Sequence, residues 1–176
     1  MDLNEIINKS LKLINNKNFS EALDLLNQIS VKDHQVFFIK GSIYILLNNL
    51  DLAEENLKNS ISLNSKNPSA FHNLANLYIK KNNLELAKEN FLSAIKINNN
   101  IPSLCELAFL LTKEGNFFEA EKYYKKVLEI DNSNKNAKLG LGHLYLKFNR
   151  FQQGHNLIKS INGVLRFNDS GFKIVL

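Results

Sequence analysis

The sequence has little of what small disulfide-bonded or metal-binding proteins depend on. Its 176 residues include no tryptophan, one cysteine, one methionine, two prolines and seven glycines. The lone cysteine, Cys105, excludes an intramolecular disulfide and a cysteine-rich zinc module. So few prolines and glycines do not suit collagen, a flexible linker or a turn-dense all-β protein. With 44% hydrophobic and 22% charged residues, the chain has the composition of one folded domain or a short repeat array.

Long apolar runs are also missing. The densest run, Ile43–Leu47, stops at two asparagines and is far shorter than the roughly 18 residues that suggest a membrane span. The first residues include Asp2 and Glu5, where a secretion signal needs a basic segment. We therefore expect a cytoplasmic protein without a membrane partner.

Positive charge is concentrated towards the end of the sequence. The formal net charge is +5, and residues 135–176 contain seven basic side chains but a single acid, Asp169. Acids and bases nearly balance in residues 1–134. This asymmetry indicates that the basic end meets an acidic surface, unless it is simply a solvated, lysine-rich face.

A repeat of 33 or 34 residues runs through the chain. Four segments, which begin at Phe37, Phe71, Leu104 and Lys138, place a small residue four positions later and a bulky residue seven positions later. The small residues are Gly41, Ala75, Ala108 and Gly142. A second segment with its own small residue follows each of them, and a weaker copy precedes them all. Small residues at these places would let two helices approach closely.

The spacing of apolar residues within each segment is that of an amphipathic helix. Breaks rich in asparagine separate the segments and suit helix caps and short turns. Pro68 and Pro102 fall at helix starts, where a missing N–H costs nothing. Ten helices are predicted, over residues 4–15, 19–29, 34–47, 51–63, 68–81, 84–97, 102–114, 117–130, 135–148 and 151–161.

The run from Ala70 to Tyr78, followed by Ala87, Phe91 and Ala94, closely resembles a tetratricopeptide repeat. The likeness covers residues 3–168, with repeats at about 3–33, 34–67, 68–100, 101–134 and 135–168. It implies an all-α fold, a right-handed α-solenoid of about five helix–turn–helix repeats.

Residues 163–176 depart from the family pattern. Two β-prone runs flank the turn Asn168–Gly171, which predicts a short β-hairpin-like tail that overlaps the end of the last repeat. Because an isolated hairpin is marginal in water, the tail should cap the last repeat, pair with a second copy in a homodimer, or dock on a partner. The sequence leaves these alternatives open.

The resemblance implies a non-catalytic scaffold or adaptor that binds an extended peptide or a helix of a partner protein. Its concave groove would be lined by the first helices of the repeats. In the first two repeats the implied groove positions are mostly apolar: Ile7, Asn8, Leu11, Gln35, Phe38, Ile39, Ser42, Ile45 and Leu46. In the later repeats they are more polar and basic: His72, Asn73, Asn76, Lys80, Cys105, Glu106, Phe109, Lys113, Asn136, Leu139, His143 and Lys147.

Three of these groove positions, Lys80, Lys113 and Lys147, recur at one place in successive repeats. Stacked as a ladder, they would favour a partner of acidic character. The alternative is that they lie in last helical turns because the helix dipole favours a cation there.

Catalysis has little support, since no catalytic, phosphate-binding or metal-binding motif is present. We expect no enzyme activity, no cofactor and no metal. The sharpest catalytic hypothesis places Cys105 beside His72 and Glu106, as a nucleophile or metal site. The simpler interpretation is that Cys105 is a small buried hydrophobic residue.

Two further functions remain open. Residues 135–176 interleave basic and aromatic side chains in the manner of a nucleic-acid-binding surface. These are Tyr145, Lys147, Phe148, Arg150, Phe151, Lys159, Arg166, Phe167, Phe172 and Lys173. The second alternative is that the chain is a regulatory subunit of an enzyme whose catalytic chain is separate.

Overall fold

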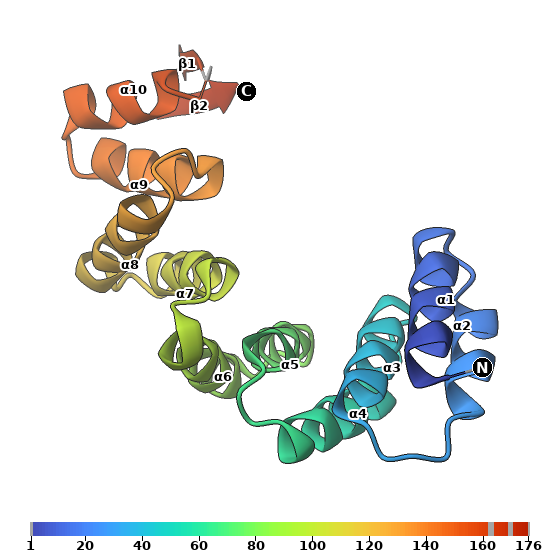
Figure 1. Cartoon of the computed structure of the whole chain (residues 1–176). Helices are drawn as coiled ribbons and strands as arrows, with labels where there is room; N and C mark the ends of the chain where they lie inside the picture. Colours follow the sequence, from blue (N-terminus) through green and yellow to red (C-terminus); the bar gives the residue numbers. More distant parts are fainter. Residues whose placement is uncertain (1, 162–163, 169–170, 176) are drawn as a thin grey trace. The chain divides into compact units, whose positions relative to one another are not determined.

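A computed structural model describes residues 2–161, 164–168 and 171–175, with side chains up to residue 161. The described residues form ten helices and two short strands (Figure 1). The helices are α1 (Leu3–Asn15), α2 (Phe19–Asn27), α3 (His34–Leu46), α4 (Leu50–Leu63), α5 (Pro68–Lys80), α6 (Leu84–Asn98), α7 (Ile101–Lys113), α8 (Phe117–Ile130), α9 (Lys135–Lys147) and α10 (Phe151–Lys159). The ten predicted helices are confirmed, each end to within two residues.

The chain divides into two compact units. The first, Met1–Asn98, contains α1–α6, and the second, Asn99–Leu176, contains α7–α10 and the strands. In each unit consecutive helices pack as pairs: α1 with α2, α3 with α4, α5 with α6, α7 with α8 and α9 with α10 (Figure 1). The helix pair is therefore the structural unit of the fold, as in a tetratricopeptide-like array.

Asparagine and aspartate side chains begin most of the first helices. At α3, the Asp33 carboxylate accepts hydrogen bonds from the backbone N–H groups of Gln35 and Val36, at 2.8 and 3.1 Å. Asn67, Asn100 and Asn134 cap α5, α7 and α9 in the same way. These caps satisfy N–H groups that have no partner inside the helix, which fixes where each helix begins.

The turn inside each helix pair contains one residue with a left-handed backbone. Their φ angles lie between 57° and 84°. They are Lys17, Asn48, Asn82, Gly115 and Asn149. Asparagine and glycine tolerate this conformation best, which explains why these residue types mark the breaks in the sequence.

Small residues bring the paired helices together. A Cβ atom added to Gly41 of α3 would lie 2.8 Å from Cγ of Leu57 of α4. This distance is shorter than the van der Waals contacts that Cβ atoms make in proteins. In the last pair, a Cβ on Gly142 would lie 2.9 Å from Cγ1 of Ile158. Leu57 and Ile158 are fully buried. The small positions therefore leave room for the bulky residues of the partner helix.

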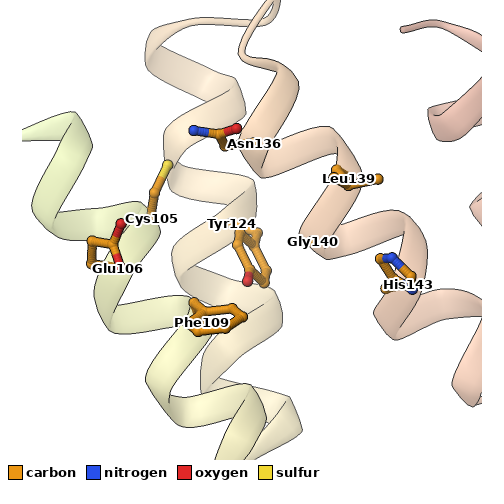
Figure 2. Close-up of a pocket in the computed structure, with 8 residues that line it drawn as sticks. All are labelled: Cys105, Glu106, Phe109, Tyr124, Asn136, Leu139, Gly140 and His143. Carbon is orange, nitrogen blue, oxygen red and sulfur yellow. The ribbon is translucent and has the colours of Figure 1, made fainter. Parts of the chain in front are cut away.

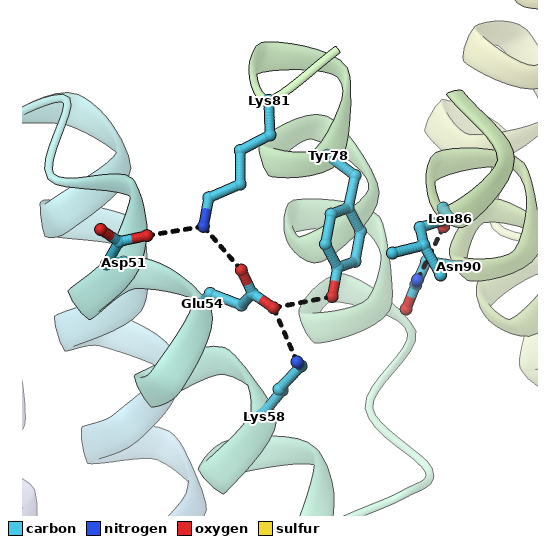
Figure 3. A network of polar contacts seen from close by, with 7 residues as sticks. All are labelled: Asp51, Glu54, Lys58, Tyr78, Lys81, Leu86 and Asn90. Atoms are coloured by element: carbon cyan, nitrogen blue, oxygen red, sulfur yellow. Dashed lines mark hydrogen bonds and ion pairs between the residues drawn. The ribbon is translucent and has the colours of Figure 1, made fainter. Parts of the chain in front are cut away.

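Polar networks join successive pairs within each unit. Between α4 and α5, the Glu54 carboxylate accepts hydrogen bonds from Lys58 (2.6 Å), Tyr78 (3.0 Å) and Lys81 (2.7 Å), and Lys81 also pairs with Asp51 (Figure 3). The Lys58 and Lys81 ammonium groups lower the pKa of Glu54 to about 2.

The second unit repeats this arrangement between α8 and α9. There Glu121 accepts hydrogen bonds from Tyr145 and Arg150, each at 3.1 Å, and pairs with Lys125 at 2.7 Å. Glu121 and Tyr145 each lie 67 residues after their counterparts in the first unit.

Strands β1 (Val164–Asn168) and β2 (Gly171–Val175) follow the last helix and are aligned antiparallel. Residues 163, 169–170 and 176 of the predicted tail lie outside the described residues, as do all side chains after residue 161. The helical array is the part of the expected fold that the structure supports. The hairpin-like tail and its role stay predictions.

Across the described ranges, the helices are too short or too polar for any of them to cross a bilayer.

Candidate functional site

A pocket of about 380 Å³ lies in the second unit between the first helices α7 and α9, with α8 behind them (Figure 2). Its lining residues are Cys105, Glu106 and Phe109 from α7, Tyr124 from α8, and Asn136, Leu139, Gly140 and His143 from α9. Six of these eight are positions that the family resemblance assigns to the groove. The repeat pattern indicates only a packing role for Tyr124 and does not assign Gly140 to the groove.

The floor of this pocket is the ring of Tyr124, which lies against Gly140. A Cβ atom at Gly140 would be 2.3 Å from Cζ of Tyr124, so the ring occupies the space of a missing side chain. Tyr124 is only 3% exposed. The pocket is therefore closed at its base by a tyrosine from the second helix of the same repeat as α7.

Acidic groups dominate one end of the pocket. Burial, followed by the nearby carboxylates of Glu106 and Asp131, raises the pKa of Cys105 to about 11. Burial also raises the pKa of the half-buried Glu106 carboxyl. Partial burial lowers the pKa of His143, which favours its uncharged form. The free pocket thus combines apolar walls with a negative charge.

The nucleophile or metal hypothesis for Cys105 gains no support from these groups. A thiol with a pKa of about 11 stays protonated at neutral pH, whereas a nucleophile or metal ligand must be a thiolate. The Cys105 Sγ lies 3.8 Å from Oδ1 of Asn134. His72 belongs to the first unit, where it lies 3.0 Å from the Asn76 amide and packs on the Phe91 ring.

The three predicted ladder lysines are all exposed and lie in the last turns of their helices. In the second unit, Lys113 Nζ is 5.2 Å from the centre of the Phe109 ring, at the border of the pocket. Lys147 Nζ is 4.2 Å from the centre of the Phe117 ring. Both ammonium groups still face solvent, so contact with an aromatic ring does not prevent them from meeting an acidic partner. Because Lys80 belongs to the other unit, the ladder itself stays a prediction.

The first unit has a hollow of its own, of about 490 Å³, between α1, α3 and the turn that leads into α5. Its apolar lining includes Ile7, Leu11, Phe38 and Ile39, all of which are implied groove positions. His34 also lines it, and the buried Nδ1 atom of His34 has no hydrogen-bond partner among the described residues. The hollow is therefore an apolar surface with a polar border.

Three other candidate residues are engaged with the protein itself. Asn73 of α5 donates a hydrogen bond to Ser42 Oγ of α3 at 2.9 Å, and Ser42 donates to the Phe38 carbonyl, also at 2.9 Å. The Asn76 amide lies 3.0 Å from His72. These contacts fix neighbouring first helices, and a ligand would have to compete with them.

The structure does not favour the proposed nucleic-acid surface. Arg150 pairs with Glu121 and stacks 3.7 Å from the centre of the Tyr145 ring, and Phe148 packs edge-on against Phe117. These side chains hold helices together. The side chains of Arg166, Phe167, Phe172 and Lys173 lie outside the described residues.

Comparison with known proteins supports the architecture. Two family models, both described as tetratricopeptide repeat, match residues 34–67 and 68–101 in one case and 111–166 in the other. No curated protein sequence matches the chain.

Among solved structures, PilF of Pseudomonas aeruginosa is similar at a TM-score of 0.83 and 14% identity, over 90% of this chain and 74% of that one. MamA is similar at a TM-score of 0.76 and 17% identity, over 92% and 94%. YrrB, described as a TPR protein with an unusual peptide-binding site, has a TM-score of 0.68 and 18% identity, over 91% and 84%. At such low identity these likenesses concern the fold alone.

Proposed function

The chain belongs to the tetratricopeptide repeat family, and on that premise we propose that it is a non-catalytic scaffold or adaptor that binds a partner protein in the groove of its first helices. Proteins of this family generally act as protein–protein interaction scaffolds. The ligand would be an extended peptide segment or a helix. A cytoplasmic location stays a prediction from the sequence.

The observation that carries the proposal is the pocket between α7 and α9. Helices of successive repeats bring Phe109, Leu139 and the Tyr124 ring to one concave, largely apolar surface with a few polar groups. Phe109 is 49% exposed there, so its ring is accessible to a bound segment. Such a surface suits one or two anchoring side chains of a bound segment. YrrB, which has a similar fold, is itself described as having a peptide-binding site.

An acidic partner is the second part of the proposal. Lys113 and Lys147 end the two helices that border the pocket, and both ammonium groups are exposed. With Lys80 they would attract carboxylates of a segment that lies along the ends of the first helices.

Selection from a random peptide display library against the whole protein tests groove binding. We expect selected peptides to lose about tenfold or more in affinity with Phe109→Ala, because this exposed ring borders the pocket. Phe118→Ala is the matched control, since Phe118 is 83% exposed but lies on the second helix α8 and does not line the pocket. Groove binding would be contradicted if the two substitutions weakened peptide affinity equally, or if neither weakened it.

Charge reversal tests the acidic character of the partner. In the Lys80→Glu, Lys113→Glu, Lys147→Glu variant, selected acidic peptides should bind at least tenfold more weakly, and parent binding should weaken with added salt. The matched control reverses three exposed lysines of second helices, outside the implied groove and the Glu54 network: Lys96, Lys122 and Lys159. A similar loss in the control would show that only net charge matters.

A further inference from the structure

We propose that the pocket of the second unit receives a cationic side chain, arginine or lysine, from the bound segment, with Glu106 as its counter-ion. This inference rests on the proposed groove binding and adds the chemistry of the anchoring residue. It also implies a partner segment with both signs of charge, since the lysines at the helix ends favour acids.

The position of Glu106 is the first support. Glu106 follows Cys105 on α7, one helical turn before Phe109. Its side chain lines the pocket and is half-buried (Figure 2). Among residues 2–161 no lysine or arginine forms an ion pair with it, in contrast to Glu54 and Glu121, which are held by two cations each. A half-buried carboxylate without a cation is costly in the free protein, and a cation supplied by a ligand would remove that cost.

The surrounding charges are the second support. The neighbouring acid Asp131, at the turn between α8 and α9, adds to the negative potential that Cys105 experiences, although the Lys138 ammonium group offsets part of the Asp131 charge. Burial lowers the pKa of His143 on the opposite wall, which reduces the positive charge that a ligand cation would meet there. Lys113 is seven residues from Glu106 along α7, or about 10 Å along the helix axis. The pocket is therefore acidic towards the start of α7 and basic towards its end.

The aromatic walls are the third support. Phe109 and Tyr124 lie on the same pocket as the carboxylate, and their labelled rings face the space between α7 and α9 (Figure 2). The aliphatic stem of an arginine or lysine packs well on such apolar walls while its charged group reaches the Glu106 carboxylate. An acidic side chain would be repelled by Glu106.

Cys105 is the only thiol of the protein and also lines the pocket. Its reaction rates with charged reagents therefore report the electrostatic potential of the pocket. Three methanethiosulfonate reagents are compared, carrying an aminoethyl, a methyl or a sulfonatoethyl group. We expect the cationic reagent to modify Cys105 at least tenfold faster than the anionic one, after correction for their rates with a free thiol. Glu106→Gln should reduce this ratio at least threefold. Glu129→Gln, which removes an exposed carboxylate elsewhere in the same unit, should leave it unchanged.

The occupant is tested with four capped pentapeptides, alanine–leucine–X–leucine–alanine, in which X is arginine, citrulline, leucine or glutamate. Binding to the whole ¹⁵N-labelled protein is followed by amide chemical shifts. We expect the arginine peptide to shift amides of α7 and α9 and to bind about tenfold more tightly than the citrulline peptide. Glu106→Gln should abolish that preference, and Glu129→Gln should retain it.

The outcomes separate the two proposals. If the leucine or glutamate peptide binds between α7 and α9 as tightly as the arginine peptide, or if Glu106→Gln changes neither ratio, the cationic preference is wrong while groove binding stands. If no peptide shifts the amides of α7 and α9, groove binding fails and this inference fails with it.

Discussion

At Gly140, the absence of a side chain determines where the Tyr124 ring lies. An alanine there would place Cβ 2.3 Å from the ring, against a residue that is almost fully buried. We expect Gly140→Ala to lower the free energy of unfolding by about 1–2 kcal/mol, because overpacking outweighs the gain of about 1 kcal/mol from removing a helical glycine. Urea unfolding measures it.

The control for Gly140 is Asn136→Ala, which introduces the same residue at an exposed position of α9 and should change stability by less than about 0.5 kcal/mol. In a Tyr124→Leu background the cost of Gly140→Ala should shrink. If Gly140→Ala were as stable as the parent, the close contact with Tyr124 would be wrong.

Cys105 should react slowly with alkylating reagents. Its pKa of about 11, against an ordinary 9.0, leaves roughly a hundredfold fewer thiolates at neutral pH. We expect iodoacetamide at pH 7.5 to label the folded protein about 100 times more slowly than the same chain unfolded in urea. The folded rate should keep rising with pH until about 11. A folded rate close to the unfolded one would contradict the assignment.

At the scale of helices, the network around Glu54 fastens α4 to α5. Glu54 is ionised in the folded protein because its pKa is lowered to about 2 by hydrogen bonds from Lys58 and Lys81. Its contribution to stability is therefore present above about pH 4.5 and is lost as the pH falls towards 2. We expect Glu54→Gln to cost about 1 kcal/mol at pH 7, a modest figure because the network is partly exposed.

Urea unfolding at pH 7 and at pH 2 checks this expectation. The difference between Glu54→Gln and the parent should be clear at pH 7 and nearly absent at pH 2. The neighbouring Glu55 is exposed, so Glu55→Gln should be close to neutral at both. A cost for Glu54→Gln that does not depend on pH would show that the charge is not what matters.

Helix positions could be predicted from the sequence because they depend on local features. Apolar spacing, asparagine breaks and Pro68 or Pro102 at a helix start all act within a few residues. The polar networks could not, since Arg150 pairs with an acid 29 residues away and the choice depends on side-chain geometry. The single-repeat period does not indicate them, since the position one repeat after Glu54 holds Lys88, of opposite charge, and the network recurs only after two repeats, at Glu121.

The candidate site was predictable only in part, for a related reason. The family resemblance identifies the face of α7 and α9 and therefore Phe109, Leu139 and Glu106. It does not indicate that Glu106 lacks a cation or that the Tyr124 ring reaches the pocket through Gly140. Both features depend on how the side chains of α7, α8 and α9 pack, and a repeat pattern does not contain that information.

At the scale of the whole molecule, the division after Asn98 predicts that the first unit folds by itself. Its helices contact neighbours close in sequence, α3 with α4, α4 with α5 and α5 with α6, and repeat arrays gain stability from such local interfaces. We expect residues 1–98 to be helical by circular dichroism and to unfold cooperatively in urea. Residues 1–83, which omit α6, should lose that cooperativity because they expose Leu74 and Leu77. A gradual transition for residues 1–98 would contradict the prediction.

The predicted tail, residues 163–176, provides a second test at this scale. Its run Ile174–Leu176 is apolar and needs a cover. If the tail pairs two copies, the full chain should sediment as a dimer and a chain that stops at Asn162 as a monomer. The same oligomeric state for both chains would discard tail-mediated dimerisation and leave capping of the last repeat or docking on a partner.

The left-handed residue inside every helix pair also affects how such a chain can grow. Since Asn48, Asn82, Gly115 and Asn149 give these corners one backbone conformation, each pair enters its second helix by the same path. A duplicated stretch of 34 residues could be spliced in at a corner without redesign of its flanks. Adding or removing whole 34-residue repeats would then change the number of ligand-anchoring positions in the groove. The conformation of each remaining turn would stay the same.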